Sequence, residues 1–396
     1  MKYDFDTIID RSKMNSGKWN IMKEINPNID KNIVPLSVAD MEFPTAPEIV
    51  KGLKEYIDNI PLGYTSPSYE YFREVINWIY KKHQVSVERD WVIPFGGIVP
   101  ALFALIYSLT EPRDGVLILS PVYYPFKRSI NNTGRTIVEA PLKLENNYYT
   151  IDYEELEEKA KLPSTKLLIF CNPHNPIGRV WKKEEMKKVA DICFKYDVII
   201  ISDEIHNDLI MPGYKHTMFS SISEEISKKI IVCTAPSKTF NLAGMLTSNL
   251  IIRNEEYRNK LKSHMEANSM REMNSLGYEA CRIAYSQCEG WLEELIKVLD
   301  RNKKLVENFV KSNLPGVVVY PLEGTYLQWL DFRCYGLDYK ELEKVMQFEA
   351  QCFLDEGYIF GDMAKEFERI NIACPTLVLE DALKRIYTAF KKRGLI

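Results

Sequence analysis

The feature of this sequence that most constrains its fold is a series of six short apolar runs between residues 91 and 252. The runs are rich in β-branched residues, are apolar on both faces, and alternate with segments of helical periodicity. This pattern is typical of parallel strands that helices bury on both sides. It therefore predicts an α/β fold around a buried parallel sheet. The runs are residues 91–93, 116–119, 167–170, 198–201, 230–233 and 250–252.

Helical patterns flank the runs and indicate more than one domain. Residues 47–60 place their apolar side chains on one face, with Thr45 as a candidate cap upstream, and residues 68–82 repeat the pattern. A long amphipathic helix follows residue 285, and then a shorter α+β stretch. Because 396 residues exceed one ordinary core, we expect a large domain over residues 46–284. A smaller domain is expected from residues 1–45 together with residues 285–396.

Composition narrows the class of protein. A formal net charge of −4 with scattered Lys and Arg argues against a nucleic-acid partner. No apolar run approaches the roughly 20 residues of a membrane span, and the first residues are acidic rather than those of a signal peptide. The eight cysteines form no CxxC pair and mostly lie within apolar runs. We expect reduced thiols, no metal site and a cytoplasmic protein.

Two charged residues stand directly after predicted buried strands. Asp203 follows the run at 198–201, where a buried carboxylate needs a cationic partner; a helix cap or a local pair is the alternative. Lys238 follows the run at 230–233, where desolvation lowers the pKa of an amine, as imine formation requires. The alternative for Lys238 is an ordinary surface lysine.

Three further loops end predicted strands with unusual residues. Asn175 lies among two Asn-Pro steps and a Gly, which restrict a turn strongly. Tyr123 offers an aromatic ring on a loop, and Gly97 opens a helix whose backbone N–H groups could hold a phosphate. An acid, a lysine, an amide, a ring and a phosphate seat are together the groups that bind pyridoxal 5′-phosphate (PLP).

These residues lie in strings that resemble a known family. The chain is similar, over essentially its whole length, to the fold-type I PLP-dependent enzymes of aminotransferase class I/II. Within them it resembles the MalY/PatB-type cystathionine β-lyases, or C–S lyases. The resemblance implies a mostly parallel seven-stranded sheet plus a smaller α+β domain. The matching strings are residues 16–19 (SGKW), 39–43 (ADMEF), 63–65 (GYT), 172–181 (NPHNPIGRVW), 202–206 (SDEIH), 237–244 (SKTFNLAG), 323–329 (EGTYLQW) and 369–375 (RINIACP).

The resemblance also implies roles for the residues that react. Lys238 is expected to hold PLP as an imine and then to move the substrate proton, and Asp203 to pair with the pyridinium nitrogen. Arg369 is expected to clamp the substrate α-carboxylate, a task suited to a guanidinium fork. Tyr64 is expected to act in catalysis and cofactor binding from the other subunit of a homodimer.

Further residues are implied to hold the cofactor or the substrate. Asn175 and His206 are expected to hydrogen-bond the phenolic oxygen of PLP, and Tyr123 to stack on its ring. Ala39, Asn175 and Tyr123 are also expected to contact the substrate. The phosphate is expected to lie at Gly97, Ile98 and Ser237. Tyr123, Trp19 and Tyr326 are candidates for the leaving-group pocket, with a purely structural role equally open for Trp19 and Tyr326.

Two reactions are compatible with this site. The first is β-elimination from L-cystathionine or another cysteine S-conjugate, giving a thiol such as homocysteine, pyruvate and ammonia. The alternative is transamination between an L-amino acid and a 2-oxo acid. Many aminotransferases carry an Arg eight residues after the imine lysine; this chain has Leu246 there, which favours the lyase. Glu42 and Thr376 depart from the lyase strings and leave the substrate open. A third hypothesis is a regulatory contact with a transcription regulator.

Overall fold

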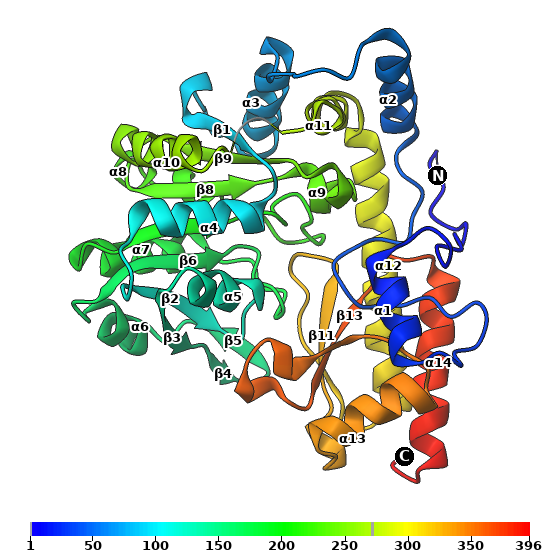
Figure 1. Cartoon of the computed structure of the whole chain (residues 1–396). Coiled ribbons are helices and arrows are strands. Elements are labelled where there is room, and N and C mark those ends of the chain that lie inside the picture. The colour runs from blue at the N-terminus through cyan, green and yellow to red at the C-terminus, as the bar shows by residue number, and fades with distance from the viewer. Residues whose placement is uncertain (1, 271–272) are drawn as a thin grey trace.

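The computed structural model describes residues 2–270 and 273–396, and a seven-stranded sheet dominates it (Figure 1). The strand order is β1-β9-β8-β7-β6-β2-β3. All strands run parallel except β9, which is antiparallel to both of its neighbours. The strands are β1 (Val92–Phe95), β2 (Gly115–Ser120), β3 (Thr136–Pro141), β6 (Thr165–Cys171), β7 (Ile199–Asp203), β8 (Ile230–Thr234) and β9 (Ser248–Ile252).

The six predicted runs coincide with six of these strands, so the mostly parallel α/β sheet is confirmed. The seventh, β3, lies at the sheet edge and alternates between exposed and buried residues. It therefore lacks the continuous apolar run that identified the others. Within β2, Val116 and Ile118 point into one core, whereas Leu117 and Leu119 point into the other. This alternation is the reason why both faces of the strand are apolar.

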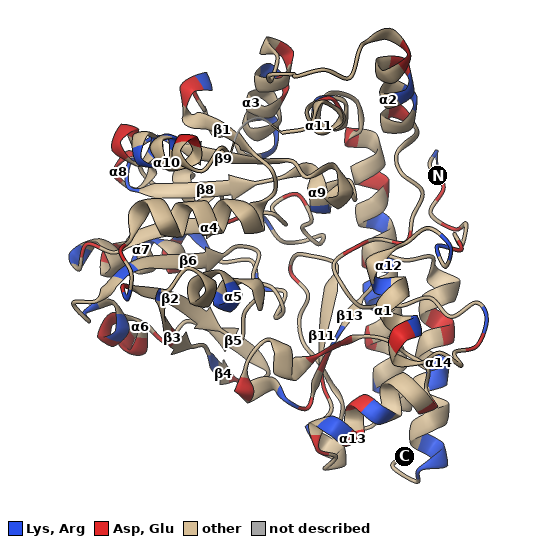
Figure 2. Cartoon of the chain, in the orientation of Figure 1, with Lys and Arg blue, Asp and Glu red and all other residues tan. Residues whose placement is uncertain are grey.

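Helices cover both faces of the sheet. One core is closed by α4 (Ile98–Leu109), α5 (Pro125–Asn132) and α10 (Glu255–Ala267). The other is closed by α3 (Tyr69–His83), α6 (Tyr153–Ala160), α7 (Lys183–Lys195) and α11 (Ser275–Gln287). Basic and acidic residues are interspersed along the outer helices, as in α10 (Figure 2).

A second, antiparallel sheet lies beside the first, in the order β10-β11-β13-β12. The N-terminal segment joins it, because Leu36 exchanges backbone hydrogen bonds with Phe353 and Asn371. Figure 1 shows α1 (Gly17–Ile25), α14 (Thr376–Lys392) and the long helix α12 (Glu289–Asn313) around this sheet. The strands are β10 (Val318–Val319), β11 (Leu327–Asp331), β12 (Asp355–Glu356) and β13 (Phe367–Asn371). The domain boundaries at residues 45 and 284 stay a prediction.

The predicted helices are present, with one correction. Helix α3 is capped by Ser68, whose Oγ accepts from Tyr71 N at 3.2 Å. Helix α2 (Pro47–Asn59) has Ala46 at its N-cap without a side-chain hydrogen bond, so the predicted cap at Thr45 is wrong. Proline at the first helical position has no N–H group and reduces the need for a cap. Within residues 2–270 and 273–396, no helix combines the length and apolar composition that crossing a bilayer requires.

Candidate active site

Residues at the carboxyl ends of the central strands converge with one residue of the second sheet. Asp203 ends β7, Lys238 lies in the short helix α9 (Pro236–Thr239) after β8, and Asn175 follows β6. The Lys238 charge acts on Asp203. Arg369 on β13 reaches Asn175, with Nη1 donating to Oδ1 at 2.6 Å. The structure therefore brings these four predicted residues together between the two sheets.

Lys238 has the environment of a reactive amine. Its Nζ donates to the Ala39 carbonyl at 2.5 Å. Desolvation lowers the pKa of Lys238 to about 8, although the nearby Asp40 carboxylate opposes this. Because an ordinary lysine titrates about two pH units higher, Lys238 has a much larger neutral, nucleophilic fraction near neutral pH.

Asp203 and His206 are buried with few partners. The Asp203 carboxylate accepts one hydrogen bond within the described part of the chain, from Ile205 N at 3.2 Å. Burial raises the pKa of Asp203 to about 7, and the Glu204 charge adds to this. Burial lowers the pKa of His206 well below its usual value, and its Nδ1 has no partner among the described residues. Buried polar groups normally have partners, so both side chains retain capacity to hydrogen-bond a ligand.

Arg369 is held so that one edge of its guanidinium is occupied. Nε and Nη2 donate to Asp355 Oδ2 at 3.2 and 2.5 Å, and the group lies 4.6 Å from the Phe360 ring centroid. Asp355 stands directly opposite Arg369 in the β12–β13 pair. Each terminal guanidinium nitrogen carries two N–H groups. Asn175 Oδ1 accepts a hydrogen bond from one of the two N–H groups on Nη1. Nη1 and Nη2 therefore keep N–H groups for a substrate carboxylate.

The helix α4 begins as the phosphate prediction requires. Gly97 occupies its N-cap with a φ of 111° and supplies no capping side chain. A Cβ built at Gly96 would meet nothing within 4 Å. The first N–H groups of a 12-residue helix, starting at Ile98, have no intrahelical acceptor, and helix starts of this kind can bind phosphates. Ser237, at the start of α9, remains the predicted side-chain contribution.

The two tyrosines predicted to contact the cofactor lie in different places. Tyr123 is partly buried, its hydroxyl pKa is raised by burial, and the Arg369 and Asp203 charges act on it. Tyr64 is fully exposed and lies apart from the other predicted site residues. It lines an open cavity of about 1050 Å³ with Leu62, Met273 and Tyr278. Within one chain, Tyr64 is not brought to the site.

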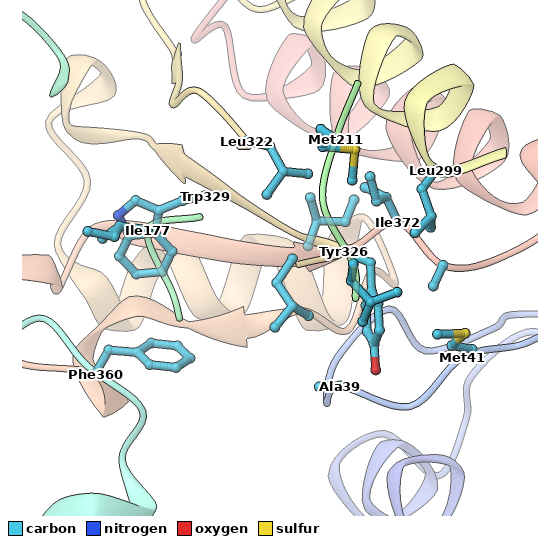
Figure 3. Close-up of a cluster of buried hydrophobic side chains, with 14 of the residues drawn as sticks. Ala39, Met41, Ile177, Met211, Leu299, Leu322, Tyr326, Trp329, Phe360 and Ile372 are labelled. Carbon is cyan, nitrogen blue, oxygen red and sulfur yellow. The ribbon is translucent and has the colours of Figure 1, made fainter. Parts of the chain in front are cut away.

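Asp355 contacts the site through Arg369, and the two pocket candidates Tyr326 and Trp19 lie in different surroundings. Asp355 holds Arg369, yet no local sequence signal marks it, because the pairing depends on strand register. Tyr326 is fully buried, and its hydroxyl has no partner among the described residues. Figure 3 shows this hydroxyl pointing toward Ala39. Trp19 instead donates to Glu42 Oε1 at 3.3 Å in a buried pair, which favours the structural alternative.

The backbone is strained at two positions beside the site. Val38 and Thr325 adopt φ angles of 58° and 74°, where β-branched residues are rare. They precede Ala39 and Tyr326 in the chain. Hydrogen bonds hold both conformations: Val38 N donates to Asp355 Oδ2 at 2.9 Å, and Thr325 N donates to the Leu209 carbonyl at 2.8 Å. Such strain concentrates at functional sites.

The described residues fit PLP. Its ring nitrogen needs an acid, its aldehyde an amine and its phosphate an anion site. Asp203, Lys238 and the start of α4 offer these groups. The imidazole of His206, whose Nδ1 has no hydrogen-bond partner among the described residues, lies near Lys238 and Arg369, whose charges act on it. The arrangement can therefore bind PLP and an amino acid carboxylate side by side.

Comparison with known proteins agrees with this geometry. The sequence is 48% identical to cystalysin from Treponema denticola, whose crystal structure contains PLP; the TM-score is 0.98, covering 99% of this chain and all of that one. It is 36% identical to the cystathionine β-lyase PatB of Bacillus subtilis, covering 98% of this chain and 99% of that protein. A PLP-bound C–S lyase from Staphylococcus hominis is 32% identical with a TM-score of 0.90, covering 98% of each chain. Residues 31–386 match the family described as aminotransferase class I and II. The chain belongs to this aminotransferase class I and II family.

Proposed function

We propose that this protein is a PLP-dependent β-lyase. It cleaves the C–S bond of L-cystathionine or a related cysteine S-conjugate and yields a thiol, pyruvate and ammonia. The observation that carries the proposal is the grouping of Lys238, Asp203 and Arg369 in a chain with full-length similarity to proteins named cystathionine β-lyase and C–S lyase. Leu246, in the place of an aminotransferase arginine, supports elimination over transamination.

Each site residue has a task in this reaction. PLP, when bound, supplies an electron sink for the electron pair left behind by the α-proton. Lys238 Nζ takes that proton, which its lowered pKa permits. Arg369 and Asn175 orient the α-carboxylate, and Asp203 keeps a proton on the ring nitrogen. The thiolate would then depart from Cβ and take up a proton, and the three-carbon remainder would be hydrolysed by one water molecule to pyruvate and ammonia.

The proposal includes a homodimer with shared sites. Several large apolar side chains are exposed on the segment from α2 to the start of α3, and exposed apolar groups of this kind are frequent at interfaces. The exposed side chains are Val50, Ile57, Leu62, Tyr64 and Tyr69. A second copy of the chain covering this surface would bring Tyr64 to the partner's site. Sedimentation of the holoenzyme tests this, and a fully active monomer would contradict it.

The proposed location is the cytoplasm. All eight cysteines lie in the described residues, none forms a disulfide, and every one except Cys334 is buried. Buried, unpaired thiols fit a reducing compartment. The division into residues 46–284 and residues 1–45 with 285–396 belongs to the same proposal.

One assay separates elimination from transamination. The purified holoenzyme is incubated with L-cystathionine and no oxo acid, and pyruvate and free thiol are measured. Stoichiometric release of both is the expected result. Absence of turnover, together with rapid amino transfer from an amino acid to 2-oxoglutarate, would replace the lyase by the aminotransferase.

A further inference from the structure

A buried carboxylate behind the site links the two segments that hold opposite ends of the cofactor. Asp208 Oδ2 accepts a hydrogen bond from Thr239 Oγ1 at 2.9 Å, and both residues are buried. Thr239 is the neighbour of Lys238 in α9, and Asp208 follows Asp203 by five residues. We infer that Asp208 is a positioning residue that fixes the separation of Lys238 from Asp203 through Thr239. The inference rests on the proposed PLP site.

The segment between Asp203 and Asp208 is rigid. Backbone hydrogen bonds from Asn207 to Glu204 and from Leu209 to His206 close its turns at 3.0 and 2.9 Å. Glu204 is fully buried and anchors the turn in the core. Its carboxylate accepts from Ser202 Oγ at 2.8 Å, from Phe219 N at 2.9 Å, and pairs with His216 Nε2 at 2.8 Å. The position of Asp208 relative to Asp203 is therefore set by the core.

The segment that carries Lys238 needs such an anchor. Helix α9 has four residues, too few to be stable by itself. Lys238 makes a hydrogen bond to Ala39, but its amine is the reacting group and leaves that contact when it is used. The Thr239 hydroxyl has no part in the reaction. Its bond to Asp208 is a direct side-chain link between α9 and the segment that carries Asp203.

Two residues of helix α3 also contact the Asp208 carboxylate. Trp78 Nε1 lies 3.2 and 3.1 Å from the two carboxylate oxygens, and His83 Nε2 lies 3.4 Å from Oδ1. Burial by itself would raise the pKa of Asp208, but the neighbouring His83 side chain and the hydrogen bonds from Thr239 and Trp78 outweigh it and lower the pKa. Asp208 is thus ionised at neutral pH, and its bonds are charge-assisted and strong.

Loss of this link should affect catalysis more than substrate binding. Asp203 and Lys238 would hold two different atoms of the same PLP ring, and a displacement of about 1 Å in a reacting group costs about 100-fold in rate. Arg369, which holds the substrate carboxylate, lies on β13 and is on neither segment. We expect kcat to fall while KM stays nearly constant.

Two substitutions of Thr239 test the inference against a matched control. Thr239→Val keeps the shape and removes the hydroxyl, whereas Thr239→Ser keeps the hydroxyl. Thr376→Val is the control, because Thr376 Oγ1 donates to Asn302 Oδ1 at 2.8 Å in another part of the fold. The measurements are kcat, KM, melting temperature and the pH midpoint of the visible absorbance that PLP acquires on binding Lys238. Thr239→Val should lower kcat by about 10- to 100-fold and shift the absorbance midpoint, with KM within about twofold.

The other variants decide between positioning and general stability. Thr239→Ser should restore kcat to within about threefold of the wild type, and Thr376→Val should leave kcat and the absorbance midpoint unchanged. A Thr239→Val enzyme with wild-type kcat and midpoint would overturn the inference. So would a loss of kcat that follows the fall in melting temperature equally in Thr239→Val and Thr376→Val.

The test remains decisive if Thr239→Val does not fold and if the proposed reaction is wrong. If Thr239→Val does not fold, Thr239→Ala removes the same hydroxyl without placing a second methyl group against the core, and it is measured in the same way. If the wild type forms the absorbing species but does not cleave cystathionine, the proposed reaction fails while the absorbance midpoint still tests Asp208. A wild type that forms no such species would refute the PLP site itself.

Discussion

Two groups of buried charged residues follow strands of the large sheet, and they differ in how they are partnered. In the first, Arg179 Nε donates to Glu323 at 3.1 Å, and Nη2 donates to Glu185 at 3.1 Å. Arg179 also bonds the Tyr149 carbonyl and lies 4.1 Å from the Tyr148 ring centroid. This Arg179 cluster is nearly saturated with partners.

The second group, Asp203, His206 and Lys238, is partnered sparsely. It has one hydrogen bond to the Asp203 carboxylate, an unpartnered His206 Nδ1 among the described residues, and a lysine bound to one carbonyl. Breaking up a partnered buried cluster costs stability, whereas unpartnered buried groups already bear a desolvation cost. In this comparison both groups are buried, and they differ in the number of partners: the Arg179 cluster has many, and the residues predicted to bind the cofactor have few.

The largest effect is expected from Lys238→Ala. Turnover should fall by more than about 10⁴-fold, the upper end of proton-transfer contributions alone, and the visible absorbance of bound PLP should disappear. The melting temperature of the protein without PLP should not fall. The exposed Lys228→Ala variant is the control. A yellow, borohydride-reducible species that survives in Lys238→Ala would show that another residue binds the cofactor.

Arg179→Gln should act in the opposite way. Removing one partner of a buried ion pair leaves Glu323 uncompensated and costs about 3–5 kcal/mol of stability. The denaturation midpoint should therefore fall sharply, while folded enzyme keeps its PLP absorbance and most of its kcat. If stability is unchanged and PLP is lost instead, the Arg179 cluster belongs to the active site and the comparison fails.

Arg369→Ala tests the guanidinium group that reaches from the second sheet to Asn175, which follows β6 of the large sheet. We expect amino acid binding to weaken by about 2–5 kcal/mol, because a buried, charge-assisted contact is lost. Spectral titration with an amino acid and with the matching amine, which lacks the carboxylate, measures this. The amine should bind the variant and the wild type equally. Equal weakening of both ligands would refute the carboxylate assignment.

Asp203→Asn should stabilise the protein when PLP is absent. Burial raises the pKa of Asp203 to about 7, so the folded state keeps a proton that the unfolded state releases near pH 4. Stability without PLP should consequently fall as pH rises from about 4 to 7 and then level off. Asparagine removes this loss, a gain on the order of 4 kcal/mol above pH 7. With PLP bound, the variant should instead hold the cofactor less tightly; a destabilised PLP-free variant would contradict the assignment.

The smallest effect is expected from Tyr64→Phe. Loss of one hydrogen bond to PLP from the partner subunit should cost about 0.5–1.5 kcal/mol, measured as faster cofactor loss on dilution. Tyr69→Phe, on the same exposed surface, serves as the control. Equal cofactor retention by both variants would remove Tyr64 from the site.

Sequence patterns predicted the parts of the molecule whose structure depends on residues that are close together in the sequence. Continuous apolar runs identified the central strands, and the residues directly after them included Asp203, Lys238 and Asn175. The edge strand β3 was not predicted, because its outer face is solvated and its sequence therefore lacks a continuous apolar run. Arg369 came only from family resemblance, and Asp355 was missed. Both lie in the second sheet, where the β12–β13 register pairs residues that are fourteen positions apart.

The strained backbone at Val38 and Thr325 means that thermal stability and catalytic turnover place opposite demands on these two positions. Glycine or asparagine adopts positive φ at lower energy, so selection for a higher melting temperature alone would favour them at both positions. The same exchange would loosen the residues that follow, Ala39 and Tyr326, which border the site. Natural proteins commonly retain such strain where activity requires it. A thermostable variant of this enzyme should therefore be sought elsewhere in the chain, with these two residues left as they are.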